Sequence, residues 1–160
     1  MTESRIPDGY KMGVALDDEA REALGAQQNA TVGTLNPDGS INLANVWFLF
    51  EGDRLYFETA SATRKARNVA EREAVSALVS HPDVDVRAEG RGRVLLGEEA
   101  QAINRRIRAK YETDAAQEHF FSSIDDCAIE VSVDRWRTWR NHVLRAGIRA
   151  VREQSSSDPT

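Results

Sequence analysis

The chain has 160 residues, a formal net charge of −5 and a hydrophobic fraction of 41%. This length and composition predict a single globular domain that buries roughly 70% of its unfolded surface. No apolar run is long enough to span a membrane and no signal-peptide pattern is present, so we expect a cytoplasmic protein without a membrane partner. The acidic balance argues against a general nucleic-acid binder. The single cysteine, Cys127, excludes an intramolecular disulfide and a multi-thiolate metal site.

The N-terminal part of the chain predicts a flexible arm, a short helix and three strands. Residues 1–16 show no clear hydrophobic period and are expected to form the arm. Acidic residues open the helix, which is expected over residues 20–28. The segments NPDGS and EGD predict turns between the strands, because proline presets φ and glycine permits positive φ. The strands are expected at residues 29–35, 41–50 and 54–59.

The rest of the chain mixes predicted helices and strands and ends in a polar tail. A helix over residues 98–111 is indicated by Ile103, Ile107 and Tyr111, which recur every four residues and mark one buried stripe. Residues 154–160 are polar and are expected to form a disordered tail. Further helices are expected at residues 62–72, 114–122 and 141–152. Further strands are expected at residues 75–80, 84–96 and 126–133.

The second predicted strand is apolar on both of its alternating faces. Trp47 and Leu49 lie on one face, together with Asn45, and Val46 and Phe48 lie on the other. A sheet with one face in water alternates cleanly between apolar and polar residues. Burial of both faces therefore predicts a barrel wall that is also covered by a partner chain or a flat ligand.

Two glycines, Gly90 and Gly92, share one face of the strand expected over residues 84–96. Paired glycines allow a strand to bend or allow a neighbour to approach its backbone, and we expect barrel curvature. They form no dinucleotide-binding motif, because the spacing is not GxGxxG and the glycines lie inside a strand.

A cluster of cations lies where a strand gives way to a helix. Residues 56–71 read YFETASATRKARNVAE, and Ser61 is expected to be the N-cap of the helix that contains Arg64, Lys65 and Arg67. A helix N-terminus carries partial positive charge, so cations oppose it. A bound anion, most simply a phosphate, would resolve this conflict. The alternative is a solvated helix face that contacts nothing.

The sequence contains no recognisable catalytic motif. There is no P-loop, no HExxH and no GxSxG segment. The three histidines, His81, His119 and His142, are scattered and indicate no metal site. Any redox chemistry would therefore depend on a cofactor.

The order of these segments resembles the pyridoxamine 5'-phosphate oxidase-like superfamily of flavin- or deazaflavin-binding split β-barrels. The resemblance runs from about residue 30 to residue 94, with weaker agreement over residues 129–139. It is carried by the PDG turn, the NVWF and LYFET strands, the TRKARN segment and the VSALV strand. It implies a mainly β fold with flanking helices, in which a six-stranded split β-barrel occupies residues 17–153.

The resemblance also implies a cofactor site in three parts at the interface of a homodimer. Arg64 and Lys65 would bind the cofactor phosphate, with hydroxyl groups from Thr59 and Ser61. The isoalloxazine ring would lie against the second strand, at Asn45, Val46, Trp47 and Phe48. The second copy would complete the site with Trp136, Trp139 and Arg140, and Arg137 is a further candidate there. Barrel core is the alternative for Trp47 and Phe48, and ordinary interface packing is the alternative for the C-terminal residues.

The activity implied by the resemblance is that of an FMN-dependent oxidoreductase, with the deazaflavin coenzyme F420 as the alternative cofactor. The bound cofactor would exchange a hydride with a small organic substrate stacked on its ring. The segment WRTWRNHVLR replaces the arginine–histidine motif with which pyridoxamine phosphate oxidases bind the substrate phosphate. The chain thus departs from the family at the substrate site, and no side chain stands out as a catalytic acid or base.

Two other classes of function remain open. One is a non-catalytic FMN- or haem-binding sensor or carrier with the same fold. The other is a protein that binds nucleic acid or an anionic surface through a basic C-terminal segment. The cations of that segment are Arg137, Arg140, Arg145, Arg149 and Arg152. The apolar stripe Leu144, Ile148 and Val151 in the same segment favours dimer or core packing instead.

Overall fold

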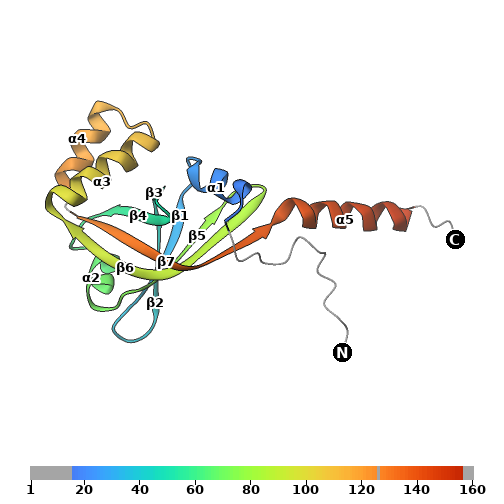
Figure 1. The fold of residues 1–160 in the computed structure, drawn as a ribbon, viewed down its shortest axis with the longest axis horizontal. Coiled ribbons are helices and arrows are strands. Elements are labelled where there is room, and N and C mark those ends of the chain that lie inside the picture. The colour runs from blue at the N-terminus through green and yellow to red at the C-terminus, as the bar shows by residue number, and fades with distance from the viewer. Residues whose placement is uncertain (1–15, 126, 157–160) are drawn as a thin grey trace.

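The computed structural model describes residues 16–125 and 127–156 and shows a mainly β fold with flanking helices, as expected (Figure 1). Its helices are α1 (Asp18–Gly25), α2 (Arg64–Glu71), α3 (Gly97–Lys110), α4 (Ala115–Ile124) and α5 (Asn141–Ser156). Its strands are β1 (Ala30–Leu35), β2 (Ile41–Val46), β3 (Phe48–Glu51), β4 (Arg54–Thr59), β5 (Ala74–Ser80), β6 (Val84–Leu96) and β7 (Cys127–Arg140).

The strands form one antiparallel sheet in the order β2-β1-β5-β6-β7-β4-β3. The predicted number of six strands is wrong, because the segment expected as one strand over residues 41–50 is divided at Trp47. Its first part pairs with β1 and its second part pairs with β4, so one extended segment supplies both edges of the sheet. These edges do not pair with each other, and the sheet in the described part of the chain is not a closed barrel.

The main hydrophobic core lies on the inner face of the curved sheet. Leu24 and its neighbours on α1 pack against this core, and Val69 contributes to it from α2. Its largest strand residues, all buried, are Val32, Phe48, Leu55, Phe57, Val79, Val84, Val86, Ile129 and Val131. Burying such side chains stabilises the fold by about 1.5–3 kcal/mol each.

A second core lies on the outer face, where α3 covers part of the sheet. Ile103 and Ile107 of α3 pack against Leu95, and Trp47 and Leu49 join this cluster from the opposite side of the strand that carries Phe48. The predicted cover for the second face of this segment was a partner chain or a flat ligand. That prediction is wrong around residues 47–49, because the chain's own helix α3 covers them.

The two glycines of β6 serve different purposes. The register between β6 and β7 shifts between Glu89 and Gly90, and a Cβ atom at Gly90 would collide with the backbone of Ser132. This irregularity bends the strand, as the sequence predicts. A Cβ atom at Gly92 would lie 2.8 Å from side-chain atoms of Val69 and Val75, so this glycine allows α2 to pack closely on the sheet.

The C-terminal part of the chain is more regular than predicted. Strand β7 continues seven residues beyond the expected end at residue 133, and α5 follows it directly. Residues 154–156 belong to α5 and not to the predicted tail, whereas residues 157–160 lie outside the described residues. Leu16, the last residue of the predicted arm, packs against the core, and the other residues of that arm lie outside the described part. No helix of the described residues combines the length and the apolar composition needed to cross a membrane.

Candidate functional site

The basic cluster lies at the junction between β4 and α2, as the sequence predicts. Thr63 is the N-cap of α2, and its hydroxyl oxygen accepts a hydrogen bond from the backbone N–H of Ala66. The same hydroxyl donates to the carbonyl of Ala60 and lies 2.9 Å from the hydroxyl of the buried Thr59. The prediction of Ser61 as the N-cap is therefore wrong, because a threonine nearer to the helix has the required geometry. Ser61 is exposed in the turn that precedes the helix.

The first turn of α2 has an unusual charge. It contains no acidic residue, whereas α1, α3 and α4 all begin with acids, as the helix dipole prefers. Arg64 is exposed, and hydrogen bonds from Ser40 together with the charge of Arg64 lower the pKa of the nearby Asp38 carboxyl group. With the turn residues Asn36, Pro37 and Asp38, Arg64 lines an open hollow of about 330 Å³. The helix start thus offers backbone N–H groups and an exposed guanidinium to an anion.

Lys65 has different neighbours from Arg64, because its charge interacts with Asp125 and Cys127. Burial lowers the pKa of the Lys65 ammonium, and the nearby acidic Asp125 and the thiol of Cys127 act in the opposite direction. A half-buried ammonium with a lowered pKa gains from an anionic ligand, because the ligand replaces the lost hydration. The two cations therefore lie at the helix start in different surroundings.

The residues predicted to contact the isoalloxazine ring differ in their accessibility. Asn45 is exposed on β2, where its side-chain oxygen accepts a hydrogen bond of 2.8 Å from the hydroxyl of Thr31. The side chains of Val46 and Phe48 are buried in the main core. These two residues can reach a ligand only through their backbone groups.

Trp47 is half-buried and held by aromatic neighbours. It stacks on Tyr111 with ring centroids 4.7 Å apart, and it packs edge-to-face with Phe121 of α4 with ring centroids 5.3 Å apart. The hydroxyl of Tyr111 donates to the carbonyl of Gln28 and accepts from the N–H of Phe48 at 3.2 Å. Trp47 is thus a fixed part of the wall between β2 and β3, which favours the core interpretation of this side chain.

The C-terminal group of predicted site residues lies far from the basic cluster within one chain. Thr59 pairs with the first residue of β7, whereas Arg140 is the last residue of this 14-residue strand. A straight strand of 14 residues spans about 40 Å, so the two groups lie well apart at opposite ends of β7. Arg140 forms ion pairs with Asp17 and with Glu19 of α1. Trp136 packs edge-to-face on Phe50 at 5.7 Å, and Trp139 lies opposite Asp85.

A buried polar cluster beside Lys65 has no counterpart in the sequence-based predictions. The guanidinium of Arg108, on α3, pairs with Glu58 of β4. Both side chains are buried, with 5% of Arg108 and 6% of Glu58 exposed. Arg108 also contacts Glu118 at 3.4 Å and Ser122 at 2.8 Å on α4, and Asp125 lies 4.0 Å away. Burial and the neighbouring charge of Asp125 raise the pKa of Glu58 to about 7, against the opposing hydrogen bond from Arg108.

No sequence signal identifies this cluster. A charged residue beside the apolar stripe of a helix usually faces water. Arg108 faces inward because α4 folds over it, and this packing depends on contacts between distant segments.

Several solved structures share this fold. The protein Rv2991 from Mycobacterium tuberculosis superposes with a TM-score of 0.68 at 18% sequence identity, and the match covers 79% of this chain and 86% of that one. For an F420 reductase the TM-score is 0.60 at 20% identity, and the match covers 82% of this chain and 98% of that one. For a candidate pyridoxamine 5'-phosphate oxidase from Listeria innocua the TM-score is 0.59 at 16% identity. This match covers 76% of this chain and 95% of that one. Identities this low establish a common fold alone.

The sequence connects the chain to a family more directly. No curated protein matches it. Residues 16–140, however, match the family model described as pyridoxamine 5'-phosphate oxidase. This match covers most of the chain and includes the sheet, the basic cluster of α2 and the whole of β7. The chain therefore belongs to the pyridoxamine 5'-phosphate oxidase family.

Proposed function

We propose that the protein is an oxidoreductase that binds FMN, or alternatively the deazaflavin coenzyme F420, and acts on a small organic substrate. Membership of the pyridoxamine 5'-phosphate oxidase family and the fold shared with an F420 reductase support this proposal. The observation that carries it is the start of α2. There, a helix without first-turn acids carries an exposed arginine and a half-buried lysine.

The groups at the start of α2 fit a phosphate chemically. Phosphate oxygens accept charge-assisted hydrogen bonds from a guanidinium, an ammonium and the N–H groups of a helix N-terminus. Arg64 and Lys65 provide the two cations, and the exposed hydroxyl of Ser61 lies in the turn before them. The hydroxyl of Thr59 is buried against Thr63, so we assign it to positioning this turn.

The other predicted residues would orient the ring of the cofactor. The ring would lie along the exposed face of β2 at Asn45, where an amide group is available for a hydrogen bond. Trp47, held by Tyr111, forms a rigid apolar wall beside that face. The bound cofactor supplies the hydride chemistry, and the protein's part is to bind it, orient it and exclude water.

We further propose that the active form is a homodimer. Within one chain, Trp136, Trp139 and Arg140 cannot reach the basic cluster, because β7 separates them from it. A second copy can bring these side chains to the cofactor, as expected from the family resemblance.

The double substitution Arg64→Ala, Lys65→Ala tests the phosphate site. Each charge-assisted hydrogen bond contributes roughly 1.5–3 kcal/mol, so FMN or F420 should bind at least about a hundredfold more weakly. The affinity is measured by titrating the apo-protein with each cofactor. Arg72→Ala is the matched control, because this cation lies at the other end of α2 and pairs with Glu71.

Equal cofactor affinities in the double variant and the wild type would refute the phosphate site. In that case the two cations would belong to a solvated helix face. A wild type that binds FMN tightly but turns over with no electron donor would instead indicate a sensor or carrier.

A further inference from the structure

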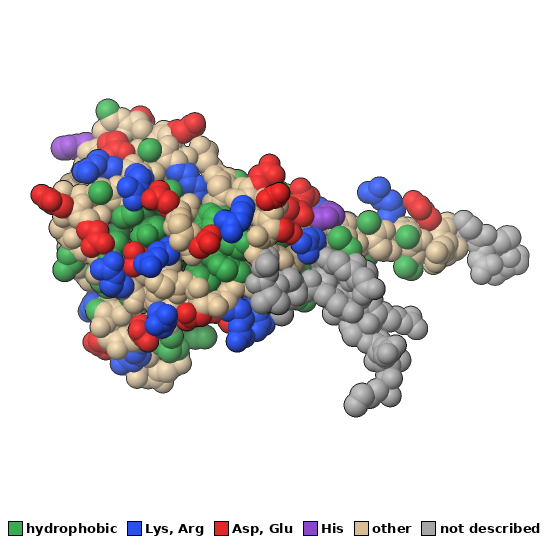
Figure 2. Space-filling view, viewed as in Figure 1, with side chains coloured by type: hydrophobic (Ala, Val, Ile, Leu, Met, Phe, Trp, Pro, Cys, Tyr) green, Lys and Arg blue, Asp and Glu red, His purple; other side chains and the backbone are tan. Residues whose placement is uncertain are grey.

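Helix α5 projects from the molecule as an arm (Figure 1). It spans residues Asn141–Ser156 and contains no buried residue. Its 16 residues correspond to a length of about 24 Å. In the space-filling view, apolar side chains are exposed along this projection (Figure 2). Among them, Ile148 is 43% exposed and Val151 is 62% exposed.

Contacts of the first five residues of α5 fix the direction of the arm. Arg145 donates to the carbonyl of Pro82 and pairs with Asp83, both at 2.9 Å. The N–H of Asn141 donates to the carbonyl of Asp83 at 2.8 Å, and His142 lies 3.2 Å from Glu19. Because α5 follows β7 without a loop and is held in this way, its outer turns point away from the chain's own sheet.

The arm carries two parallel stripes. The apolar stripe consists of Leu144, Ile148 and Val151, at the spacings of four and three that place side chains on one helix face. A stripe of arginines, Arg145, Arg149 and Arg152, follows each apolar residue by one position. An isolated helix of this length is marginal in water, because packing of the apolar face supplies most of the stability of a helix. The apolar stripe therefore needs a partner surface.

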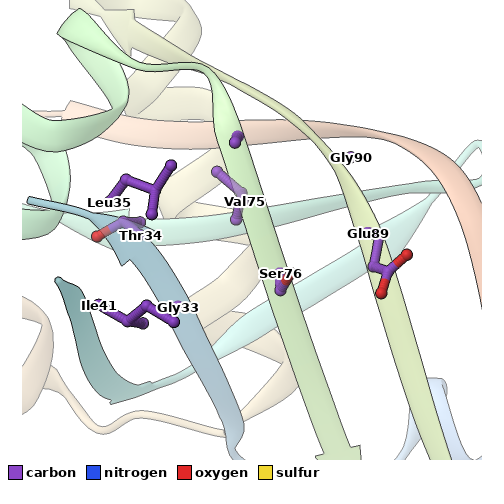
Figure 3. A pocket seen from close by; sticks show the side chains of 9 residues that line it. Gly33, Thr34, Leu35, Ile41, Val75, Ser76, Glu89 and Gly90 are labelled. Atoms are coloured by element: carbon purple, nitrogen blue, oxygen red, sulfur yellow. The ribbon is translucent and has the colours of Figure 1, made fainter. Parts of the chain in front are cut away.

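A second uncovered apolar surface lies on the outer face of the sheet. Ile41 and Leu43 of β2 are 66% and 68% exposed, and Leu78 of β5 is also exposed. The register places these residues around Gly33 of β1, where the lack of a side chain leaves a hollow of about 270 Å³ (Figure 3). We call this surface, defined by Ile41, Leu43, Leu78 and the hollow, the β2 face. The hollow is lined by apolar side chains such as Leu35 and Ile41, and Glu89 also borders it.

We propose that the apolar stripe of α5 docks onto the β2 face of a second copy of this chain. In a two-fold dimer the contact occurs twice, so a single arrangement covers both uncovered surfaces of each chain. The hollow beside Gly33 accepts one of the branched side chains of the stripe. This inference rests on the proposed homodimer and specifies the surfaces that form it.

Charge favours a second copy over an anionic surface. The arm carries three arginines and one glutamate, whereas the whole chain has a formal net charge of −5. The basic arm therefore meets an acidic body when it docks on a second copy. A membrane or a nucleic acid would attract the arm but repel the body of the same molecule.

The docking also explains how the cofactor site is completed. The arm begins directly after Trp139 and Arg140. Its target, the β2 face, continues into Asn45, which follows Leu43 on the same side of β2. In the proposed dimer the arm lies along the partner's β2 with its first turn nearest Asn45, and this orientation brings Trp139 and Arg140 towards the partner's Asn45. The two parts of the predicted site that one chain keeps apart come together between two chains.

Variants of the full chain test this arrangement through its mass in solution. We expect the wild type to have twice the chain mass of 17.8 kDa by light scattering at micromolar concentration. The arm variant Ile148→Glu, Val151→Glu and the face variant Leu43→Lys should each have the mass of one chain. The control Ala146→Glu, Ala150→Glu adds the same two charges to the side of α5 that faces away from the apolar stripe, and it should remain a dimer. Circular dichroism checks that each variant is folded.

Mixing the two variants provides a second measurement. The mixture should return to twice the chain mass, because one contact is then intact and the other joins the introduced glutamates to the introduced lysine. A face variant that stays dimeric while the arm variant dissociates would overturn the proposal in favour of pairing between two arms. The proposal would also be overturned if the arm variant were a dimer, if the wild type were a monomer, or if the mixture failed to associate.

Cofactor titration separates this inference from the proposed function. An arm variant that remains dimeric, in a protein that binds FMN or F420, overturns the docking and leaves the proposed function in place. An arm-dependent dimer that binds neither cofactor supports the docking and removes the proposed function.

Discussion

The substitution Glu58→Gln tests whether the buried cluster around Arg108 binds a proton near neutral pH. Glu58 on β4 faces α3, where it pairs with Arg108, and Asp125 and Glu118 approach the same guanidinium. Three carboxylates therefore compete for one buried cation. Lys65 is the other cation nearby, and its charge interacts with Asp125.

The magnitude follows from the pKa of Glu58, which burial and Asp125 raise from 4.5 to about 7. At about 1.4 kcal/mol per pKa unit, this difference corresponds to at most about 3.5 kcal/mol. The folded state binds the proton more tightly than the unfolded state does. The contribution to stability is therefore fully present below pH 4.5 and is lost as the pH rises through about 7.

Glutamine resembles the protonated carboxyl group and keeps the same shape at every pH. We expect Glu58→Gln to change stability little at pH 5 and to raise the free energy of unfolding, relative to wild type, by up to about 3.5 kcal/mol at pH 8. Denaturant titrations at several pH values measure this difference. Glu71 is exposed, so Glu71→Gln is the control. The free energy of unfolding of this control should change with pH in the same way as that of the wild type.

Two outcomes would refute this reasoning. If the free energies of unfolding of Glu58→Gln and the wild type change in parallel between pH 5 and pH 8, the cluster does not take up the proton. If the variant is less stable than the wild type at pH 8, the ionised pair of Glu58 and Arg108 is a net stabilising contact, and the loss of hydration is smaller than its burial indicates.

Two further substitutions test packing. Trp47→Ala removes the ring stacked on Tyr111 and should lower the free energy of unfolding by about 3–5 kcal/mol. An unchanged midpoint in denaturant unfolding would contradict the assignment of Trp47 to the second core. Gly92→Ala places a methyl group 2.8 Å from Val69 and Val75 and should cost about 1–3 kcal/mol in thermal or denaturant unfolding, whereas a neutral effect would show that α2 can shift away from β6.

Much of the fold follows from local sequence patterns. Strands β4 and β6 have the bounds that alternation and turn residues predict, and five helices were expected near the positions where the described residues form them. The basic cluster was also predicted at the correct junction, because cations at the start of a helix conflict with a local rule. Such features depend on neighbours within a few residues, which a single sequence displays.

Several parts of the candidate site could not be predicted in this way. The sequence favoured Ser61 as the N-cap, but Thr63 has the required geometry, because both residue types suit a cap and the entry angle of the chain decides between them. The pairing of Glu58 with Arg108 was missed, since it depends on α4 covering a helix face that would otherwise be solvated.

The amino-acid sequence by itself determined the helices, most of the strands and the family, through hydrophobic period, turn chemistry and the order of the segments. Only the tertiary structure decided that the chain divides at Trp47 to supply both edges of the sheet. It also placed the basic cluster and Arg140 at opposite ends of β7. The physical reason is that strand pairing and helix packing join residues distant in sequence, and local patterns carry no information about which distant partner is chosen.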